Sequence, residues 1–256
     1  MPGKRNKNMN ILIMADFTAK YPGAFVQSLV ALSHKITKNG GKIVFLFSVN
    51  RNYHTLLEHF GSVYVNKKAL GKKWSWSLLK QVLIICKKYK ISIIHVHFGL
   101  AFRLASCLSK MVYGCKLIWH WRSPPIGTLP NISKWHIFSP IVYNLLDKLC
   151  VDLHIAISND IRNILIDKHY AKAGKVRIIH NAINVPELDI KKESDFSLIE
   201  SRIKVNVKGR PIVGAIANFG PAKDYDTLLK AAEYVKKEFS NVAFLLVGDN
   251  KTGDGK

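Results

Sequence analysis

Acidic residues and long apolar runs are scarce in this sequence of 256 residues. It contains 17 Asp and Glu against 39 Lys and Arg, which gives a formal net charge of +22. No window approaches the roughly 18 consecutive apolar residues of a membrane span, and Asp16 ends the first apolar run too early for a signal peptide. We therefore expect a cytoplasmic protein. Its basic charge favours anionic partners, such as phosphorylated substrates or the inner face of the cell membrane.

Motifs that would indicate several common functions are also missing. No GxGxxG follows the first apolar strand and no GxxxxGK[ST] occurs, which disfavours a nicotinamide dehydrogenase and a P-loop ATPase. The sequence contains no recognised nucleic-acid module, so we expect no nucleic-acid partner despite the charge. No Cys or His cluster has the spacing of metal ligands, so we expect no metal site. The four cysteines are interpreted as reduced core residues: Cys86, Cys107, Cys115 and Cys150.

Residues 91–122 organise the rest of the chain. An apolar run before His97, a segment with apolar residues at helical spacing, and a second apolar run at 116–119 predict strand, helix, strand. Such strands lie parallel, and parallel sheets bind ligands at the carboxyl ends of their strands. We expect His97 and His120 to follow two such ends and to face one crevice, with Arg122 beside the second. Either histidine could instead be a polar residue tolerated just beyond a buried strand.

The first part of the chain has the same alternation of strand and helix. Apolar runs at 10–15 and 42–47 flank a segment of helical periodicity, which predicts a βαβ unit. Gly23, in the first loop, either lets the backbone approach a ligand closely or only turns the chain. A later strand at 176–179 is followed by Asn181, at the same predicted edge of the sheet.

These elements predict an α/β fold in which residues 1–185 form a Rossmann-like parallel sheet and 186–210 form a connector. Residues 211–256 begin a second Rossmann-like unit of strand, helix and strand. A complete domain needs on the order of 100 residues, and two strands with one helix cannot bury both faces of a sheet. We therefore expect this unit to be incomplete, poorly stable, or completed by a partner chain. Its helix is expected to bury Tyr225, Leu228, Leu229, Ala232, Val235 and Phe239.

The turn that enters the helix of the second unit carries Asn218 and Lys223. A helix N-terminus offers free N–H groups and the positive end of the helix dipole, so an ammonium beside it makes a site for a diphosphate. The alternative is a solvated loop lysine. Asp224 and Asp226 have the D-x-D spacing that some enzymes use to hold a divalent metal, but we interpret them as a helix cap and first-turn acid.

A basic segment with two tryptophans precedes another predicted helix. Trp74 and Trp76 lie near Lys73, Lys80 and Lys87, which recur at seven-residue spacing. Basic residues beside aromatic rings suit an anionic membrane surface, and the protein could then be peripheral at the inner face of the cell membrane. The alternative is a solvated helix face with tryptophans in the core.

Several segments, in order, carry a resemblance to a known family. IHNAINV, PIVGAIANFGPAKDYDTLLKAAEYV and VAFLLVGD, preceded by IIHVHF, LIWHWR and VDLHIAIS, resemble the retaining glycosyltransferases with two facing Rossmann-like domains (GT-B) of the "group 1" or family-four type. The resemblance implies transfer of a sugar from a nucleotide-sugar donor without a bound metal or other cofactor. The acceptor would be a cell-surface polysaccharide or lipid-linked glycan, held by the amino-terminal domain.

The resemblance also assigns residues. Lys223 matches the family's donor-phosphate lysine, Gly23 a first-loop glycine near the phosphates, and His120 a histidine that contacts the transferred sugar. Asn218 stands where many members have an arginine. His97, Arg122 and Asn181 are then candidates for binding the acceptor or sugar.

The sequence lacks the family's carboxyl-terminal acidic motif, so the resemblance implies a truncated chain of uncertain activity. Alternatives are a non-catalytic acceptor-binding subunit that needs a partner chain, and an epimerase of the same architecture.

Overall fold

The computed structural model describes residues 9–72, 74–125, 139–183, 207, 209–217, 219–220 and 223–248. The chain divides into two units, residues 1–184 and 185–256. Each is described here by itself. Most of the predicted connector, 186–210, lies outside the described residues.

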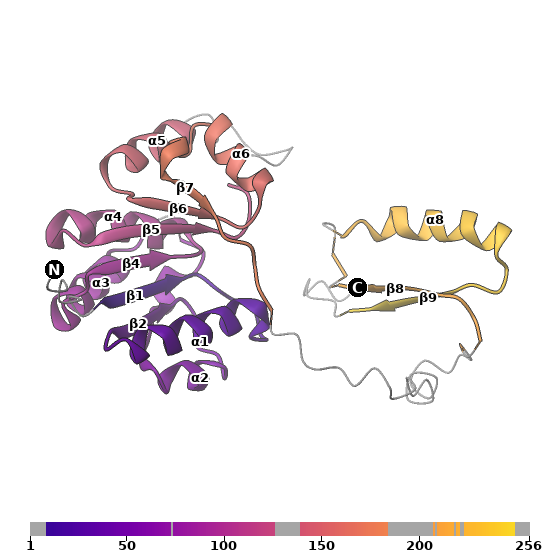
Figure 1. The fold of residues 1–256 in the computed structure, drawn as a ribbon, viewed down its shortest axis with the longest axis horizontal. Helices are drawn as coiled ribbons and strands as arrows, with labels where there is room; N and C mark the ends of the chain where they lie inside the picture. The colour runs from indigo at the N-terminus through magenta and orange to yellow at the C-terminus, as the bar shows by residue number, and fades with distance from the viewer. Residues whose placement is uncertain are drawn as a thin grey trace, which may run out of the picture. The chain divides into compact units, whose positions relative to one another are not determined.

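The first unit is built on a parallel sheet with the strand order β3-β2-β1-β4-β5-β6-β7 (Figure 1). Because the order reverses direction next to β1, the carboxyl ends of β1 and β4 border a topological switch point, where parallel sheets bind ligands. The predicted α/β fold with a Rossmann-like parallel sheet is confirmed. The strands are β1 Asn10–Ala15, β2 Lys42–Phe47, β3 Gly61–Val65, β4 Ile93–Val96, β5 Lys116–Trp121, β6 Leu153–Ala156 and β7 Val176–Ile178.

Helices lie on both faces of this sheet, as expected when parallel strands are joined by helical crossovers. On one face, α1 and α2 pack over β1 and β2, and Ile13, Leu29 and Phe45 belong to their shared core. On the other face, Val82 and Phe102 share a core with Leu165 and the opposite side chains of the strands. The helices are α1 Gly23–Lys38, α2 His54–Glu58, α3 Trp76–Tyr89, α4 Leu100–Tyr113, α5 Ser139–Leu149 and α6 Asn159–Asp167.

Side-chain caps start two of these helices. The Ser75 hydroxyl accepts from the backbone N–H of Leu78, 3.2 Å away, and Ser158 does the same for Ile161 at 3.2 Å. Each cap satisfies one of the N–H groups that a helix start leaves free and contributes about 1 kcal/mol. Gly99, before α4, has φ +84°, and a Cβ there would lie 2.6 Å from the Cβ of Asp16, so only glycine fits this close approach.

Strand β5 is longer than the apolar run at 116–119 predicted, and this changes the position of His120. The strand continues to Trp121, so His120 lies inside it rather than beyond its end. Trp119 and Trp121 are both fully buried on the α3 and α4 face. Because side chains alternate along a strand, His120 points to the other face.

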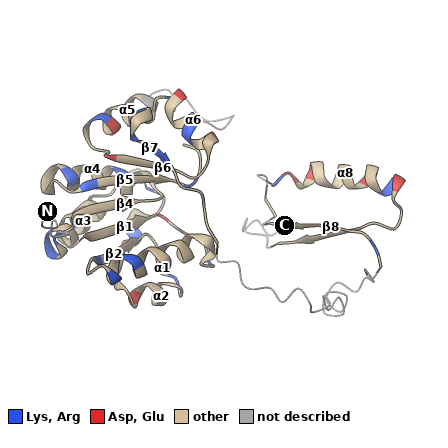
Figure 2. Cartoon of the chain, viewed as in Figure 1, with Lys and Arg blue, Asp and Glu red and all other residues tan. Residues whose placement is uncertain are grey.

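Charged side chains lie mainly on the flanking helices, while the strands are largely uncharged (Figure 2). Cys86, Cys107, Cys115 and Cys150 are free and buried, as predicted. Burial raises the pKa of the Cys86 thiol to about 12, which keeps it protonated and unreactive. None of the described helices is long and apolar enough to cross a membrane.

The described part of the second unit comprises parallel strands β8 Ile212–Ile216 and β9 Ala243–Val247 with helix α8 Tyr225–Glu238. The prediction that α8 buries its apolar face is wrong, because no residue of this helix is buried. Leu229 is 57% exposed and Phe239 66%. Two strands and one helix offer too little surface to cover that face.

Candidate functional site

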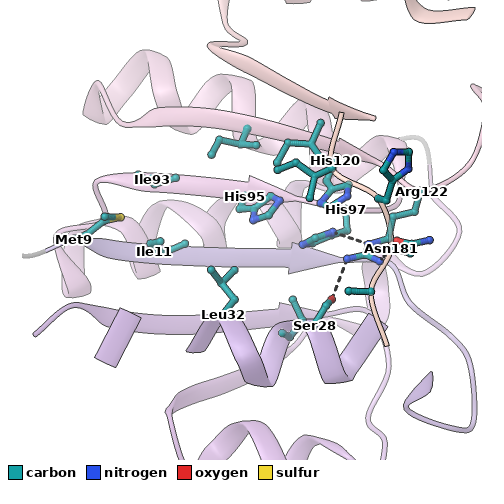
Figure 3. A pocket seen from close by; sticks show the side chains of 16 residues that line it. Met9, Ile11, Ser28, Leu32, Ile93, His95, His97, His120, Arg122 and Asn181 are labelled. Atoms are coloured by element: carbon teal, nitrogen blue, oxygen red, sulfur yellow. Dashed lines mark hydrogen bonds between the residues drawn. The ribbon is translucent and has the colours of Figure 1, made fainter. Parts of the chain in front are cut away.

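A groove of about 400 Å³ lies against the α1 face of the sheet, beside α1 and across β1, β4, β5 and β6 (Figure 3). Strand alternation places every second side chain of these strands on this face. The groove is lined by Met9, Ile11, Ser28, Leu29, Leu32, Ile93, His95, His97, Ile118, His120, Arg122, Ile155, Ile179, His180, Asn181 and Ala182.

Three histidines from neighbouring strands meet in the groove. His95 is in β4, His97 follows that strand, and His120 is in β5. Ring centroids are 4.3 Å apart for His95 and His97, and 4.9 Å apart for His97 and His120. At most 9% of any of the three is exposed. The expectation that His97 and His120 face one crevice is therefore met, and His95 joins them.

All three imidazoles are neutral near pH 7. Burial, reinforced by the positive charge of Arg122, lowers the pKa of His95 to about 4. Burial, followed by His95 and Arg122, lowers the pKa of His120 to about 3. Burial and the same neighbours hold the pKa of His97 well below its ordinary value. Neutral imidazoles can each donate one hydrogen bond and accept one, so the groove can bind polar groups without added charge.

Arg122 is the cation of the groove, and three side chains fix its guanidinium. Its Nη1 donates to the Oδ1 of Asn181 at 2.7 Å, and its Nη2 donates to the Ser28 hydroxyl at 3.0 Å. The guanidinium also lies 4.9 Å from the ring centroid of Phe25. Within the described ranges, no Asp or Glu forms an ion pair with it. Although partial burial lowers the pKa of Arg122, the group stays charged, because a guanidinium does not lose its proton in proteins.

Arg122 also sets the tautomer of His97. Its Nε donates to the Nδ1 of His97 at 3.4 Å, so the ring proton of His97 must be on Nε2. That Nε2 is buried and has no hydrogen-bond partner among the described residues, and the same holds for Nε2 of His95 and both ring nitrogens of His120. Unsatisfied buried polar groups cost about 1–3 kcal/mol each. Such a cluster indicates a site that a ligand completes.

The three histidines also resemble a metal site, which the sequence spacing did not predict. One nitrogen from each lies within 4.8 Å of the others. Two features disfavour a dication. Arg122 adds positive charge beside the cluster, and its bond to Nδ1 leaves a proton on the Nε2 of His97, where a metal ligand needs a lone pair. The cluster is better suited to anions and hydroxyl groups, and the absence of a functional metal remains a prediction.

The structure brings together four of the predicted site residues, His97, His120, Arg122 and Asn181. Sequence reasoning missed His95, which lies within the apolar run before His97. The signal available was the spacing of two residues between His95 and His97, which places both side chains on the same face of the sheet.

The other predicted residues do not line the groove. Gly23 is exposed at the first position of α1 with φ +52°, and no atom lies within 4 Å of where its Cβ would be. Lys223 is exposed in the second unit, just before α8. Asn218 lies outside the described residues. Asp224 is the N-cap of α8 and accepts from the backbone N–H of Thr227 at 3.4 Å, which supports its interpretation as a helix cap.

The parallel sheet, its switch point and a groove whose polar end lies at the carboxyl ends of the strands place the first unit in the class of Rossmann-like α/β proteins. A family model described as Glycosyltransferase Family 4 matches residues 26–186. The chain therefore belongs to glycosyltransferase family 4. No curated protein sequence matches it.

Solved structures with the same fold include two glycosyltransferases. HepE of Anabaena, solved with UDP and glucose, has a TM-score of 0.63 at 16% identity, covering 93% of this chain and 69% of its own. A glycosyltransferase from Rickettsia africae has a TM-score of 0.62 at 12% identity, with 95% and 69% covered. The UDP-GlcNAc 2-epimerase of Neisseria meningitidis, bound to UDP-GlcNAc, has a TM-score of 0.51 at 13% identity, with 93% and 65% covered. At these identities the likeness concerns the fold.

Proposed function

We propose that this protein transfers a sugar from a nucleotide-diphosphate sugar to a cell-surface polysaccharide or lipid-linked acceptor, with retention of configuration and without a bound metal. Membership in glycosyltransferase family 4 supports the reaction class. The observation that carries the proposal is the meeting of His97, His120, Arg122 and Asn181 in one groove. Neutral, buried imidazoles beside a fixed guanidinium can hold the hydroxyl groups of a sugar and exclude water.

In this proposal His120 is the catalytic-site histidine that contacts the transferred sugar. Both of its ring nitrogens are buried without a partner among the described residues, so a sugar hydroxyl could use either one. His97, Arg122 and Asn181 would orient the acceptor or sugar. Because the low pKa of His120 keeps the ring neutral, binding would not depend on its protonation near pH 7.

The donor diphosphate would bind at the start of α8. The exposed Lys223 ammonium and the first N–H groups of the helix would together stabilise the charge of the departing nucleotide. Asn218 belongs to the same turn in the sequence.

The proposed location is the cytoplasm, with peripheral contact at the inner face of the cell membrane. Trp76 supports this contact, because 73% of its side chain is exposed at the start of α3, rather than tucked into the core.

The test is to incubate the purified chain with a panel of UDP-, GDP- and ADP-sugars and measure release of the nucleoside diphosphate, with and without a chelator. We expect release with at least one donor, insensitive to the chelator, and NMR of any product should show retention. Lys223→Ala and His120→Ala should each lower kcat/KM by about a hundredfold. Matched controls are Lys230→Ala, on the same helix, and the exposed His59→Ala. Absence of release and of nucleotide-sugar binding with every donor would refute the proposed activity.

One observation favours the alternative of a non-catalytic acceptor-binding subunit completed by a partner chain. The described strands and helix of the second unit leave apolar side chains in solvent, with Ile216 88% exposed and Phe239 66%. Apolar surface of this kind indicates contact with further protein. Acceptor binding without nucleotide-sugar turnover, with turnover restored by a partner, would favour this alternative.

A further inference from the structure

The groove has two chemically different ends. Aliphatic side chains line its length toward the amino ends of the strands, where Met9, Ile11 and Ile93 lie, while Ser28, Arg122 and Asn181 gather at the carboxyl ends (Figure 3). Leu32, from α1, adds to the apolar stretch. A sugar alone would bury its hydroxyl groups against these aliphatic residues without partners, which is unfavourable.

The polar end has the features of a binding site for an anion. Arg122 has five N–H donors, and three hydrogen bonds to His97, Asn181 and Ser28 leave two of them for a ligand. All three acceptors are neutral, and no ion pair with Arg122 forms among the residues that the structure describes. The Nε2–H of His97 is a further buried donor without a partner there. A carboxylate or phosphate would satisfy these donors through charge-assisted hydrogen bonds.

The volume limits the size of such a ligand. At about 30 Å³ per water-sized group, 400 Å³ holds on the order of 12 to 15 non-hydrogen atoms, the size of a ten-carbon carboxylate or phosphate. That corresponds to a short aliphatic chain with one small head group.

We propose that the groove binds an anionic amphiphile, with its aliphatic chain along the apolar strand residues and its phosphate or carboxylate head group on Arg122 and His97. This inference rests on the proposed function in one respect: the amphiphile is taken to be the lipid portion of the acceptor. The head group would then lie at the carboxyl ends of the strands, the edge where parallel sheets bind ligands.

The test is calorimetric titration of the whole chain with four probes below their critical micelle concentrations. Decyl phosphate and decanoate carry both features and distinguish the two head groups. Decanol lacks the charge, and glucose 6-phosphate lacks the chain. We expect decyl phosphate or decanoate to bind at least tenfold more tightly than decanol and glucose 6-phosphate. Equal affinity for decanol, or binding of glucose 6-phosphate alone, would overturn the proposal.

Two variants examine the two ends separately. Arg122→Gln should weaken binding of the charged amphiphile by about tenfold to a hundredfold and leave decanol unchanged. Leu32→Gln, at a half-buried position of α1, should weaken both amphiphiles and decanol alike. Arg162→Gln, on α6, removes the same charge away from the groove and should change neither. Thermal unfolding of each variant shows whether it is folded. If Arg122→Gln does not fold, Arg122→Lys takes its place; it keeps the charge but loses the planar donor fork, and it should weaken the charged amphiphile and leave decanol unchanged.

The outcomes separate this inference from the proposed function. UDP-sugar binding with no amphiphile binding would overturn the inference and leave the glycosyltransferase proposal standing. Amphiphile binding without any nucleotide-sugar binding would support the inference and overturn the glycosyltransferase proposal. Preference for Zn²⁺ over every amphiphile, lost in His95→Leu, would assign the histidines to a metal and overturn the inference.

Discussion

The two faces of the sheet in the first unit both bury histidine, but in different surroundings. On the face covered by α3, α4 and α6, His154 is fully buried. Its Nδ1 accepts from Trp121 Nε1 at 2.9 Å, so its Nε2 carries the proton and donates to Asp147 at 2.7 Å. On the α1 face, Nε2 of His95 and Nε2 of His97 are buried without a partner among the described residues.

The difference separates a structural histidine from a binding one. His154 connects β5, β6 and α5 through two hydrogen bonds and needs nothing further. Each unsatisfied histidine nitrogen of the groove costs about 1–3 kcal/mol in the free protein, and the cost is recovered only when a ligand is bound. We therefore expect mutation of His154 to lower stability, and mutation of the groove histidines to weaken ligand binding with little loss of stability.

The largest expected effect is on stability at acid pH. The folded-state pKa of His95 is about 4 and that of His120 about 3, below the ordinary value near 6.5, so the unfolded chain binds protons that the folded one does not. Above about pH 6.5 these two histidines leave the free energy of unfolding unchanged with pH. As pH falls from 6.5 toward 4, the free energy of unfolding decreases by about 1.4 kcal/mol per pH unit for each histidine.

Chemical unfolding at a series of pH values measures this slope. His95→Leu should reduce it by about 1.4 kcal/mol per pH unit between pH 6 and 4.5, whereas His59→Ala, at an exposed position, should not. A slope unchanged by His95→Leu would show that this imidazole is already protonated in the folded protein, contrary to the structure.

The next largest effect concerns the face covered by α3, α4 and α6, where His154 has both of its hydrogen-bond partners. Asp147→Ala should destabilise the first unit by about 2–4 kcal/mol, because it leaves the His154 Nε2–H and the backbone N–H of Lys172 without their acceptor. Denaturant unfolding measures the loss, and the exposed Asp167→Ala is the matched control, expected within about 0.5 kcal/mol. Equal behaviour of the two variants would mean that the buried network contributes nothing.

The smallest expected effect is the difference in stability between matched histidine substitutions on the two faces. His154→Leu should cost about 1–3 kcal/mol, since it removes the acceptor of Trp121 and the donor to Asp147. His95→Leu should change stability at pH 7 by less than about 1 kcal/mol, because an apolar side chain of similar volume replaces an unsatisfied polar one. If His95→Leu proves as destabilising as His154→Leu, the groove histidines are structural as well.

The sequence was sufficient to predict β1, β2, β4, β7 and most of β5, and the gathering of His97, His120, Arg122 and Asn181. Each of these residues follows or ends an apolar run, and the carboxyl ends of parallel strands meet at one edge. It was not sufficient to predict the role of His95 or the true end of β5. The end of β5 depends on its pairing with β6, in which Trp121 lies opposite Ala156. The face that His95 takes depends on the register of β4 between β1 and β5. The exposed face of α8 was likewise missed, because helical periodicity reports an apolar face and not what covers it.

Periodic apolar runs, by themselves, determined the parallel α/β architecture of this protein, because strands joined by helical crossovers lie parallel and bury both faces of their sheet under helices. Only the tertiary structure decided that His95 joins His97 and His120 in the groove, and that no described carboxylate neutralises Arg122 there. The reason is that the hydrogen-bond partners and counter-charges of these side chains come from strands distant in sequence, which meet only in the folded sheet.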